Sequence, residues 1–185
     1  MTQYGPLRAQ LAEQYVREHR GMVVDPFRTF APQSPPLMHS YLQFLTRRRL
    51  PMMKDPGSEA VPNAIDWEGE KVGPQLMRWA EYTPGPYVPV GEEHKHRGIV
   101  WPWKGDVVVF AGGPGNPYGT LGVYLSHEGE GLDAVWEVFT QGPGPAQTIH
   151  LPVSAMVPVG WWRVTDERLA ARDKTATTNL QQVAP

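Results

Sequence analysis

The chain contains no cysteine. This absence excludes disulfide bonds, cysteine-based zinc or iron–sulfur sites and any thiolate nucleophile. The sequence also lacks a run of about 18 apolar residues, and its opening stretch, MTQYGPLRAQLAEQYVREHRG, has charges throughout and no apolar segment of the kind that secretory signals carry. We therefore expect a soluble protein that is not exported by a standard signal and does not bind membranes.

Charged residues are also scarce, at 19% of the chain, and the net charge is only −2. Such a balance gives no long-range attraction to nucleic acid or anionic lipid, so we expect no nucleic-acid partner. Proline and tryptophan, by contrast, are plentiful, with 20 and seven residues in a chain of 185. The length predicts one loop-rich domain over residues 1–164, anchored by large aromatic side chains, and a tail over residues 165–185.

The N-terminal part has the spacing of helices. Leucine, tyrosine and valine recur on one face of residues 7–19, which predicts an amphipathic helix with Gly21 as its stop. A second helix is predicted to begin at Ser34, which would be the N-cap before two prolines, and to end on the basic residues 47–49. Residues 75–82 are predicted to form a short third helix.

After residue 100 the pattern changes to short β-branched and apolar runs. The predicted strands are residues 106–110, 120–126, 134–140, 147–151 and 156–164, with turns rich in glycine and proline between them. Helices followed by an antiparallel meander predict an α+β fold. Residues 166–174 could form a short helix, and we expect the polar tail TATTNLQQVAP to become ordered only on a partner.

Two of these predicted strands carry the most informative motif. Residues 105–125 read GDVVVFAGGPGNPYGTLGVYL. The passage resembles the CHAP family (cysteine, histidine-dependent amidohydrolase/peptidase), in which a Gly-Asp-apolar strand and a turn precede a Gly-His-apolar-Gly strand whose histidine is the general base. In this chain Thr120 stands in the place of that histidine.

Two earlier segments carry the same resemblance. Gln33-Ser34 stands where the family has Gln-Cys at the start of a helix, and PNAIDW at residues 62–67 is similar to a Gly-Asn-Ala-x-Asp-Trp segment of phage versions. The resemblance covers roughly residues 7–164 and implies a papain-like CHAP fold, with N-terminal helices followed by an antiparallel β-sheet. It also implies that Ser34 and Thr120 are vestigial positions of a lost catalytic pair.

The residues themselves argue against catalysis at Ser34. A serine hydroxyl needs an adjacent general base, and Thr120 offers none. His127 would lie about 23 Å from Thr120 along an extended strand, His39 falls on a different helix face from Ser34, and His150 is on a later strand. We therefore expect no catalytic residue and no cofactor, and interpret Ser34 as a helix cap; a relocated pair of Ser34 with one of these histidines is the alternative.

Two other features have a functional and a structural interpretation. The segment EEHKH at residues 92–96 could gather a divalent ion through His94 and His96, but neighbouring cations oppose this and no third ligand is evident, so a solvated loop is favoured. Five tryptophans could line a sugar-binding groove, although core or edge packing is the expected role of most: Trp101, Trp103, Trp136, Trp161 and Trp162.

The resemblance makes a bacteriophage origin the leading hypothesis. We expect a catalytically inactive, CHAP-like structural or binding component of the virion, in the capsid, tail or tail tip, made in the host cytoplasm and contacting other virion proteins in multiple copies. One alternative is an active cell-wall hydrolase that uses Ser34, or a metal at His94 and His96. Another is a module that binds peptidoglycan.

Overall fold

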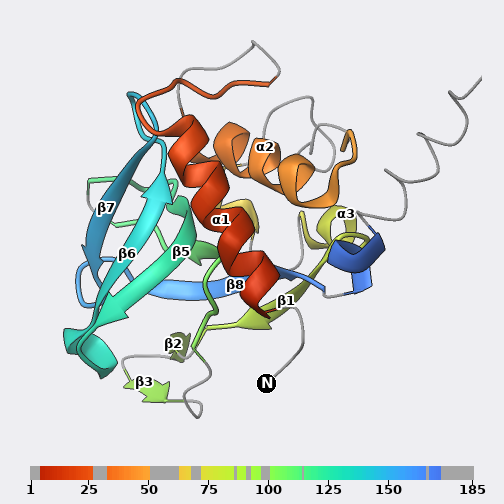
Figure 1. Ribbon diagram of the computed structural model, residues 1–185. Helices are drawn as coiled ribbons and strands as arrows, with labels where there is room; N and C mark the ends of the chain where they lie inside the picture. The colour runs from red at the N-terminus through yellow and green to blue at the C-terminus, as the bar shows by residue number, and fades with distance from the viewer. Residues whose placement is uncertain are drawn as a thin grey trace, which may run out of the picture.

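The computed structural model describes residues 5–26, 33–50, 63–67, 72–85, 87–90, 93–96, 101–113, 115–165 and 167–171 (Figure 1). Within these residues, N-terminal helices precede a six-stranded antiparallel sheet, which confirms the α+β class. No helix in the described part of the chain is long and apolar enough to cross a membrane. The predicted tail segment from residue 175 onward lies outside the described residues.

The two long helices are close to those predicted. They are α1 (Gly5–His19) and α2 (Ser34–Thr46), and the shorter helical elements are η1 (Ala64–Trp67), α3 (Gly73–Leu76) and η2 (Gly131–Asp133). Gly21 has a φ of 78°, a conformation that favours glycine, which confirms it as the stop after α1. Residues 167–171 form a helical turn within the predicted segment 166–174.

The start and end of α2 correct two predictions. The N-cap is Gln33, so the assignment of Ser34 as the cap is wrong, and no described side chain caps α2. Gln33 makes no side-chain cap bond because the second and third helical positions are Pro35 and Pro36, which have no N–H. The hydroxyl of Ser34, itself the first residue of the helix, accepts instead from the backbone N–H of Leu121. The basic residues 47–49 follow the helix instead of forming its last turn. The backbone of Arg47 is in the left-handed conformation, with a φ of 50°, and this conformation ends the helix at Thr46.

The large sheet has the strand order β1-β8-β4-β5-β6-β7. Its strands are β1 (Ala80–Pro84), β4 (Val107–Phe110), β5 (Thr120–Glu128), β6 (Val135–Thr140), β7 (Gln147–Pro152) and β8 (Pro158–Val164), and all neighbours are antiparallel. All five strands predicted after residue 100 are therefore confirmed. A separate hairpin joins β2 (Tyr87–Val90) to β3 (Glu93–His96), where a loop was predicted for part of this segment.

The predicted helix over residues 75–82 is wrong beyond Leu76, because β1 begins at Ala80. This strand pairs with β8, with Ala80 opposite Val164. Tyr82 packs against Trp162 at 4.9 Å between ring centroids. A partner about 80 residues away in sequence thus overrides the local helical pattern.

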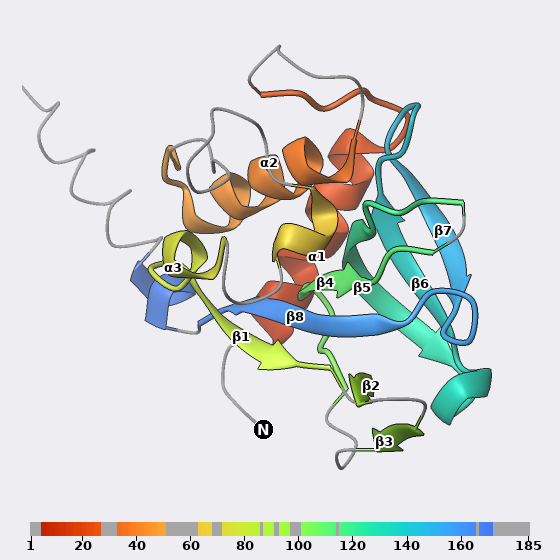
Figure 2. The same cartoon turned by 180° about the vertical axis from the view of Figure 1, so that it is seen from behind.

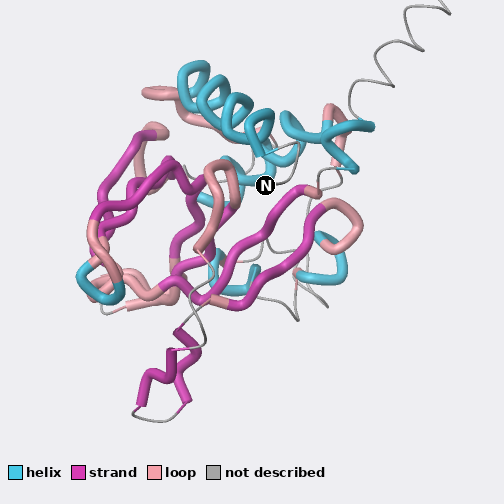
Figure 3. The backbone as a smooth tube through the Cα atoms, turned by 60° about the horizontal axis from the view of Figure 1, so that its bottom comes forward, coloured by secondary structure: helices cyan, strands magenta, loops and turns pink. Residues whose placement is uncertain are grey.

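The helices cover one face of the sheet, with α1 and α2 lying across it (Figures 1 and 2). The core on this face joins helical side chains such as Tyr15 and Tyr41 to sheet residues such as Val123 and Phe139. A second core lies on the other face, where Val108, Phe110, Trp136 and Trp161 meet. The backbone tube shows that the strands of the sheet curve (Figure 3). The curvature explains how both faces of β4, which is fully buried, are covered.

Candidate functional site

The start of α2 lies against the start of β5. The Oγ of Ser34 accepts a hydrogen bond from the backbone N–H of Leu121 at 3.0 Å, across 87 residues of sequence. Covalent geometry therefore places the Cα atoms of Ser34 and Thr120 within about 8 Å of each other. The structure thus brings together the two residues that the CHAP resemblance pairs, as we expected from sequence.

The hydroxyl of Ser34 completes the edge of a strand. Pairing between β5 and β6 ends with Val123 opposite Phe139, so the backbone of Leu121 has no strand partner on that side. Ser34 binds its N–H, and Thr140 Oγ1 donates to its carbonyl oxygen at 2.6 Å. Ser34 is only 6% exposed. It therefore occupies a buried structural position.

The hydroxyl of Thr120 is held by a different group. Asn116 Nδ2 donates to Thr120 Oγ1 at 3.0 Å and to the carbonyl oxygen of Gly119 at 2.7 Å, which ties the end of the β4–β5 turn to the first residue of β5. An asparagine amide cannot accept a proton in the way that a general base must. The place of the family's base therefore holds a neutral hydrogen-bonded pair.

Gln141 is a member of this site that the local sequence pattern does not indicate. Its side chain is 1% exposed and bonds both the N–H and the carbonyl oxygen of Val24, at 2.7 and 3.1 Å. It also donates to the carbonyl oxygen of Gln33 at 3.2 Å. Gln141 thus fixes the N-terminal end of α2 beside β6. Gln141 directly follows a predicted strand, which is the only sequence feature that marks it. A polar residue is also expected in the turn that begins there, so this position does not by itself indicate a buried role.

The histidines weighed as substitutes for the missing base have their contacts elsewhere. His39 Nε2 binds the carbonyl oxygen of Leu50 at 3.2 Å. His127 hydrogen bonds to the Tyr124 hydroxyl and stacks on Trp101, with ring centroids 4.6 Å apart. His150 is exposed on β7. These contacts support structural or surface roles and leave Ser34 without a base among the described residues.

The other candidate sites are not assembled in the described part of the chain. His94 and His96 fall on β3, whose side chains lie outside the described residues, and no group of three or more metal-binding side chains occurs within those residues. Trp136, Trp161 and Trp162 are buried in the two cores. Because they lie on opposite faces of the sheet, they cannot form one sugar-binding groove with Trp101 and Trp103.

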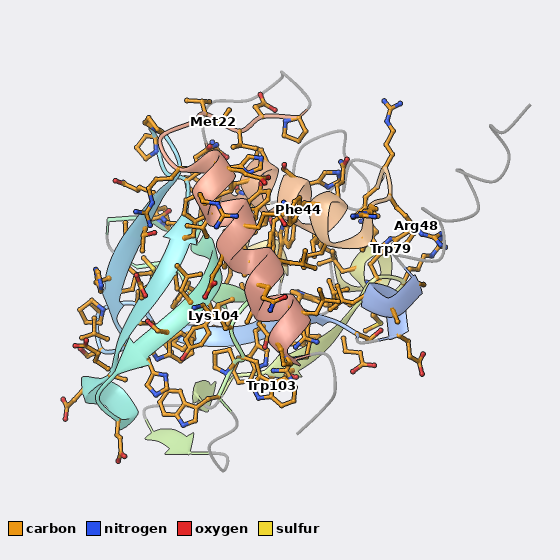
Figure 4. All side chains as sticks on the ribbon, viewed as in Figure 1. Met22, Phe44, Arg48, Trp79, Trp103 and Lys104 are labelled. Atoms are coloured by element: carbon orange, nitrogen blue, oxygen red, sulfur yellow. The ribbon has the colours of Figure 1, made fainter. Side chains whose placement is uncertain are left out.

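Basic residues after α2 also have a structural contact. The guanidinium carbon of Arg48 lies 5.7 Å from the ring centroid of Trp79, in the turn between α3 and β1 (Figure 4). A cation over an indole face is a favourable pair even at the surface. Residues 47–49 are all exposed directly after α2, and this contact gives Arg48 a structural role.

Comparison with known proteins adds no relative to this geometry: no protein-family model and no curated protein sequence matches the chain.

His39 is expected to make stability fall in mild acid. Burial lowers the pKa of His39 to about 4. The hydrogen bond to Leu50 raises this pKa, but by less than burial lowers it. Because the folded-state pKa is below that of the unfolded chain, protons bind the unfolded state more strongly, and stability is lost as pH falls below about 6.5. The loss from this residue should reach about 2 kcal/mol at pH 5. Denaturant titrations at pH 7 and pH 5 on the wild type and on His39→Gln would measure it; an equal pH dependence in both proteins would contradict the prediction.

Gly119→Ala is expected to destabilise the turn before Thr120 by about 1 to 3 kcal/mol. Gly119 has a φ of 73°, and an added Cβ would lie 2.5 Å from the carbonyl oxygen of Phe110, which is backbone and cannot move away cheaply. Gly115→Ala is the matched control in the same turn, because a Cβ there meets no described atom within 4 Å. Thermal unfolding of both variants would test this; equal melting temperatures would disprove the strain at Gly119.

Proposed function

We propose that this protein is a non-enzymatic, CHAP-like structural component of a bacteriophage particle, in which the former nucleophile and base positions, Ser34 and Thr120, now hold the fold together. The virion assignment and the papain-like fold within the α+β class both rest on the sequence resemblance. The geometry supports the proposal because it brings the two positions together and gives each hydroxyl a structural partner.

The observation that carries the proposal is the hydrogen bond from Leu121 N–H to Ser34 Oγ. A serine nucleophile must present its oxygen to substrate and donate its proton to a base. Here the oxygen accepts a hydrogen bond from the backbone N–H of Leu121 inside a buried contact. Pro35 and Pro36 also remove the N–H donors that could stabilise an anion at this helix start. The arrangement favours a fixed packing role over turnover.

Purified cell walls provide the first test. The wild-type protein should cause no loss of turbidity beyond buffer, while an active CHAP hydrolase in the same assay supplies the positive control. The double variant Ser34→Cys/Thr120→His should also be inactive, because the prolines remain and Gln141 stays bonded to Val24 and Gln33. Robust cleavage by the wild type would overturn the inactive-component proposal, whereas cleavage by the double variant alone would disprove only the argument from the prolines.

The particle assignment needs a separate experiment. Mass spectrometry of purified particles from the native system should detect the chain in a constant ratio to other virion proteins, and cross-linking should join it to them. If the chain is absent from intact particles but abundant in infected cells, the structural role fails. Retention of the wild type on insoluble peptidoglycan, measured in parallel, would instead favour the alternative of a peptidoglycan-binding module.

A further inference from the structure

A groove of about 390 Å³ lies between α1 and the middle of the sheet, away from Ser34 and Thr120. Its lining comes from four separate parts of the chain: Glu13, Val16, Arg17, Arg20, Lys104, Leu125 and Glu137. Its size falls within the range of small-molecule sites. Figure 4 shows Lys104 beside α1. Its Nζ binds the carboxylate of Glu13 on α1 at 2.6 Å, and this ion pair joins the segment before β4 to the helix.

The groove has an apolar floor with charged walls. Val16 on α1 is 7% exposed, and Leu125 on β5 is partly buried against the main core. Arg17 is on α1, and Arg20 directly follows the helix, with its backbone N–H bonded to the carbonyl oxygen of Val16 at 3.0 Å. The helical turn thus continues to Arg20, and the two arginines, three residues apart, lie on the same side. Glu137, on β6, belongs to the opposite wall. A ligand in the groove would thus contact aliphatic surface below and ionic groups on both sides.

Internal pairing leaves a definite charge pattern. Lys104 and Glu13 neutralise one another, and the hydrogen bond from Lys104 is the main cause that lowers the pKa of Glu13. Arg20 donates to the neutral hydroxyl of Thr148 at 3.0 Å, and Glu137 accepts from the neutral hydroxyl of Ser126 at 2.6 Å.

Arg17 makes no hydrogen bond to an acceptor among the described residues, but its charge acts on Glu13 one turn earlier and helps to lower the pKa of that carboxyl. Because Glu13 is already paired with Lys104, the three side chains together keep one net positive charge. With Arg20 this makes two positive charges on the helix wall, and Glu137 leaves one negative charge on the sheet wall. Neither Arg20 nor Glu137 has an ionic partner within the described part of the chain, so all three charges can contribute to recognition of a ligand.

We propose that this groove binds a small dipolar molecule, a free amino acid or short peptide whose carboxylates face Arg17 and Arg20 and whose ammonium group faces Glu137. Carboxylate matches the fork of a guanidinium. A purely anionic ligand such as a nucleic-acid backbone would be repelled by Glu137, so this residue lowers the affinity of the groove for ligands that carry only negative charge. The chemistry therefore selects a ligand that carries both signs, and the inference is independent of the role proposed for Ser34.

Calorimetric or NMR titration with the dipeptide Ala-Glu tests the proposal, since this probe has one ammonium and two carboxylate groups. The double variant Arg17→Gln/Arg20→Gln should raise the Kd about tenfold, and Glu137→Gln should raise it about threefold. Arg78→Gln is the matched control, because Arg78 is an exposed arginine outside the groove and its loss should leave the Kd unchanged.

Two further probes separate a dipolar ligand from a simple anion. N-acetyl-Ala-Glu lacks the ammonium group and should bind the wild type more weakly than Ala-Glu, and Glu137→Gln should remove this difference. Ala-Gln amide lacks both carboxylates and should not bind measurably. The proposal is overturned if Ala-Glu shows no saturable binding, if the arginine variant binds it as the wild type does, or if the acetylated probe binds equally well. Circular dichroism melts of each variant would confirm that the fold is intact.

Discussion

Replacing Asp106 by alanine is expected to lower the free energy of unfolding by about 3 to 5 kcal/mol. The carboxylate is fully buried and binds the guanidinium of Arg163 through Nε at 3.0 Å and Nη2 at 2.5 Å. It also accepts the backbone N–H of Trp103 at 2.8 Å. Without it, the Arg163 charge is left without its carboxylate in a mostly enclosed position beneath Trp103, whose ring centroid is 4.0 Å away.

Denaturant unfolding of Asp106→Ala, Arg163→Met and the double variant would measure this effect as a thermodynamic cycle. The double variant should be less destabilised than the sum of the two single variants, because it leaves neither charge alone. Asp106→Asn keeps the size of the side chain and should fall between the wild type and alanine. Additive effects, or a loss below about 1 kcal/mol for Asp106→Ala, would show that the pair does not stabilise the fold.

Tyr15→Ala is expected to cost a similar amount, about 3 to 5 kcal/mol. Tyr15 is fully buried where α1 meets α2 and the sheet. Its ring packs on Tyr41 at 5.0 Å, Phe44 at 5.3 Å and Phe139 at 6.3 Å between centroids, and its hydroxyl donates to the carbonyl oxygen of Leu37 at 3.1 Å. Removal of the ring opens a cavity at the junction of three elements.

Two control variants separate the ring from the hydroxyl and from surface effects. Tyr15→Phe keeps the ring and should cost only about 1 kcal/mol, the usual value of one hydrogen bond. Tyr118→Ala removes a tyrosine that is 62% exposed and should change the free energy of unfolding by less than about 0.5 kcal/mol. If Tyr15→Ala unfolds at the same denaturant concentration as Tyr118→Ala, the ring does not anchor the helices.

The strands after residue 100 show where sequence is sufficient. The run from Val107 to Phe110 is apolar and β-branched, and it is buried on both faces as a central strand should be. The Gly-Asp motif before it also marks a strand start correctly. The ionic partner of Asp106 could not be predicted from sequence, because Arg163 is 57 residues away. Only the pairing of β4 with β8 brings the two side chains together.

The candidate site shows the same division. The CHAP resemblance pairs Ser34 with Thr120 and so predicts that they lie close together. The hydrogen bond between Ser34 and Leu121, the residue after Thr120, confirms their proximity. The sequence did not reveal that Ser34 is a strand-edge acceptor, because that role depends on where the β5–β6 ladder ends. Nor did it reveal Thr140 and Gln141, whose partners come from distant segments.

Composition and local pattern by themselves determined that the chain has no thiol chemistry, that helices precede an antiparallel meander, and that its turns fall at glycine and proline. These properties follow from residue chemistry and from periods of a few residues, which are local. Tertiary structure alone decided that residues from Ala80 form a strand, that Gln33 replaces Ser34 as the N-cap, and that α1 and β6 enclose a charged groove. Each of these depends on burial and hydrogen bonding between segments far apart in sequence, and such contacts leave no periodic signal in either segment.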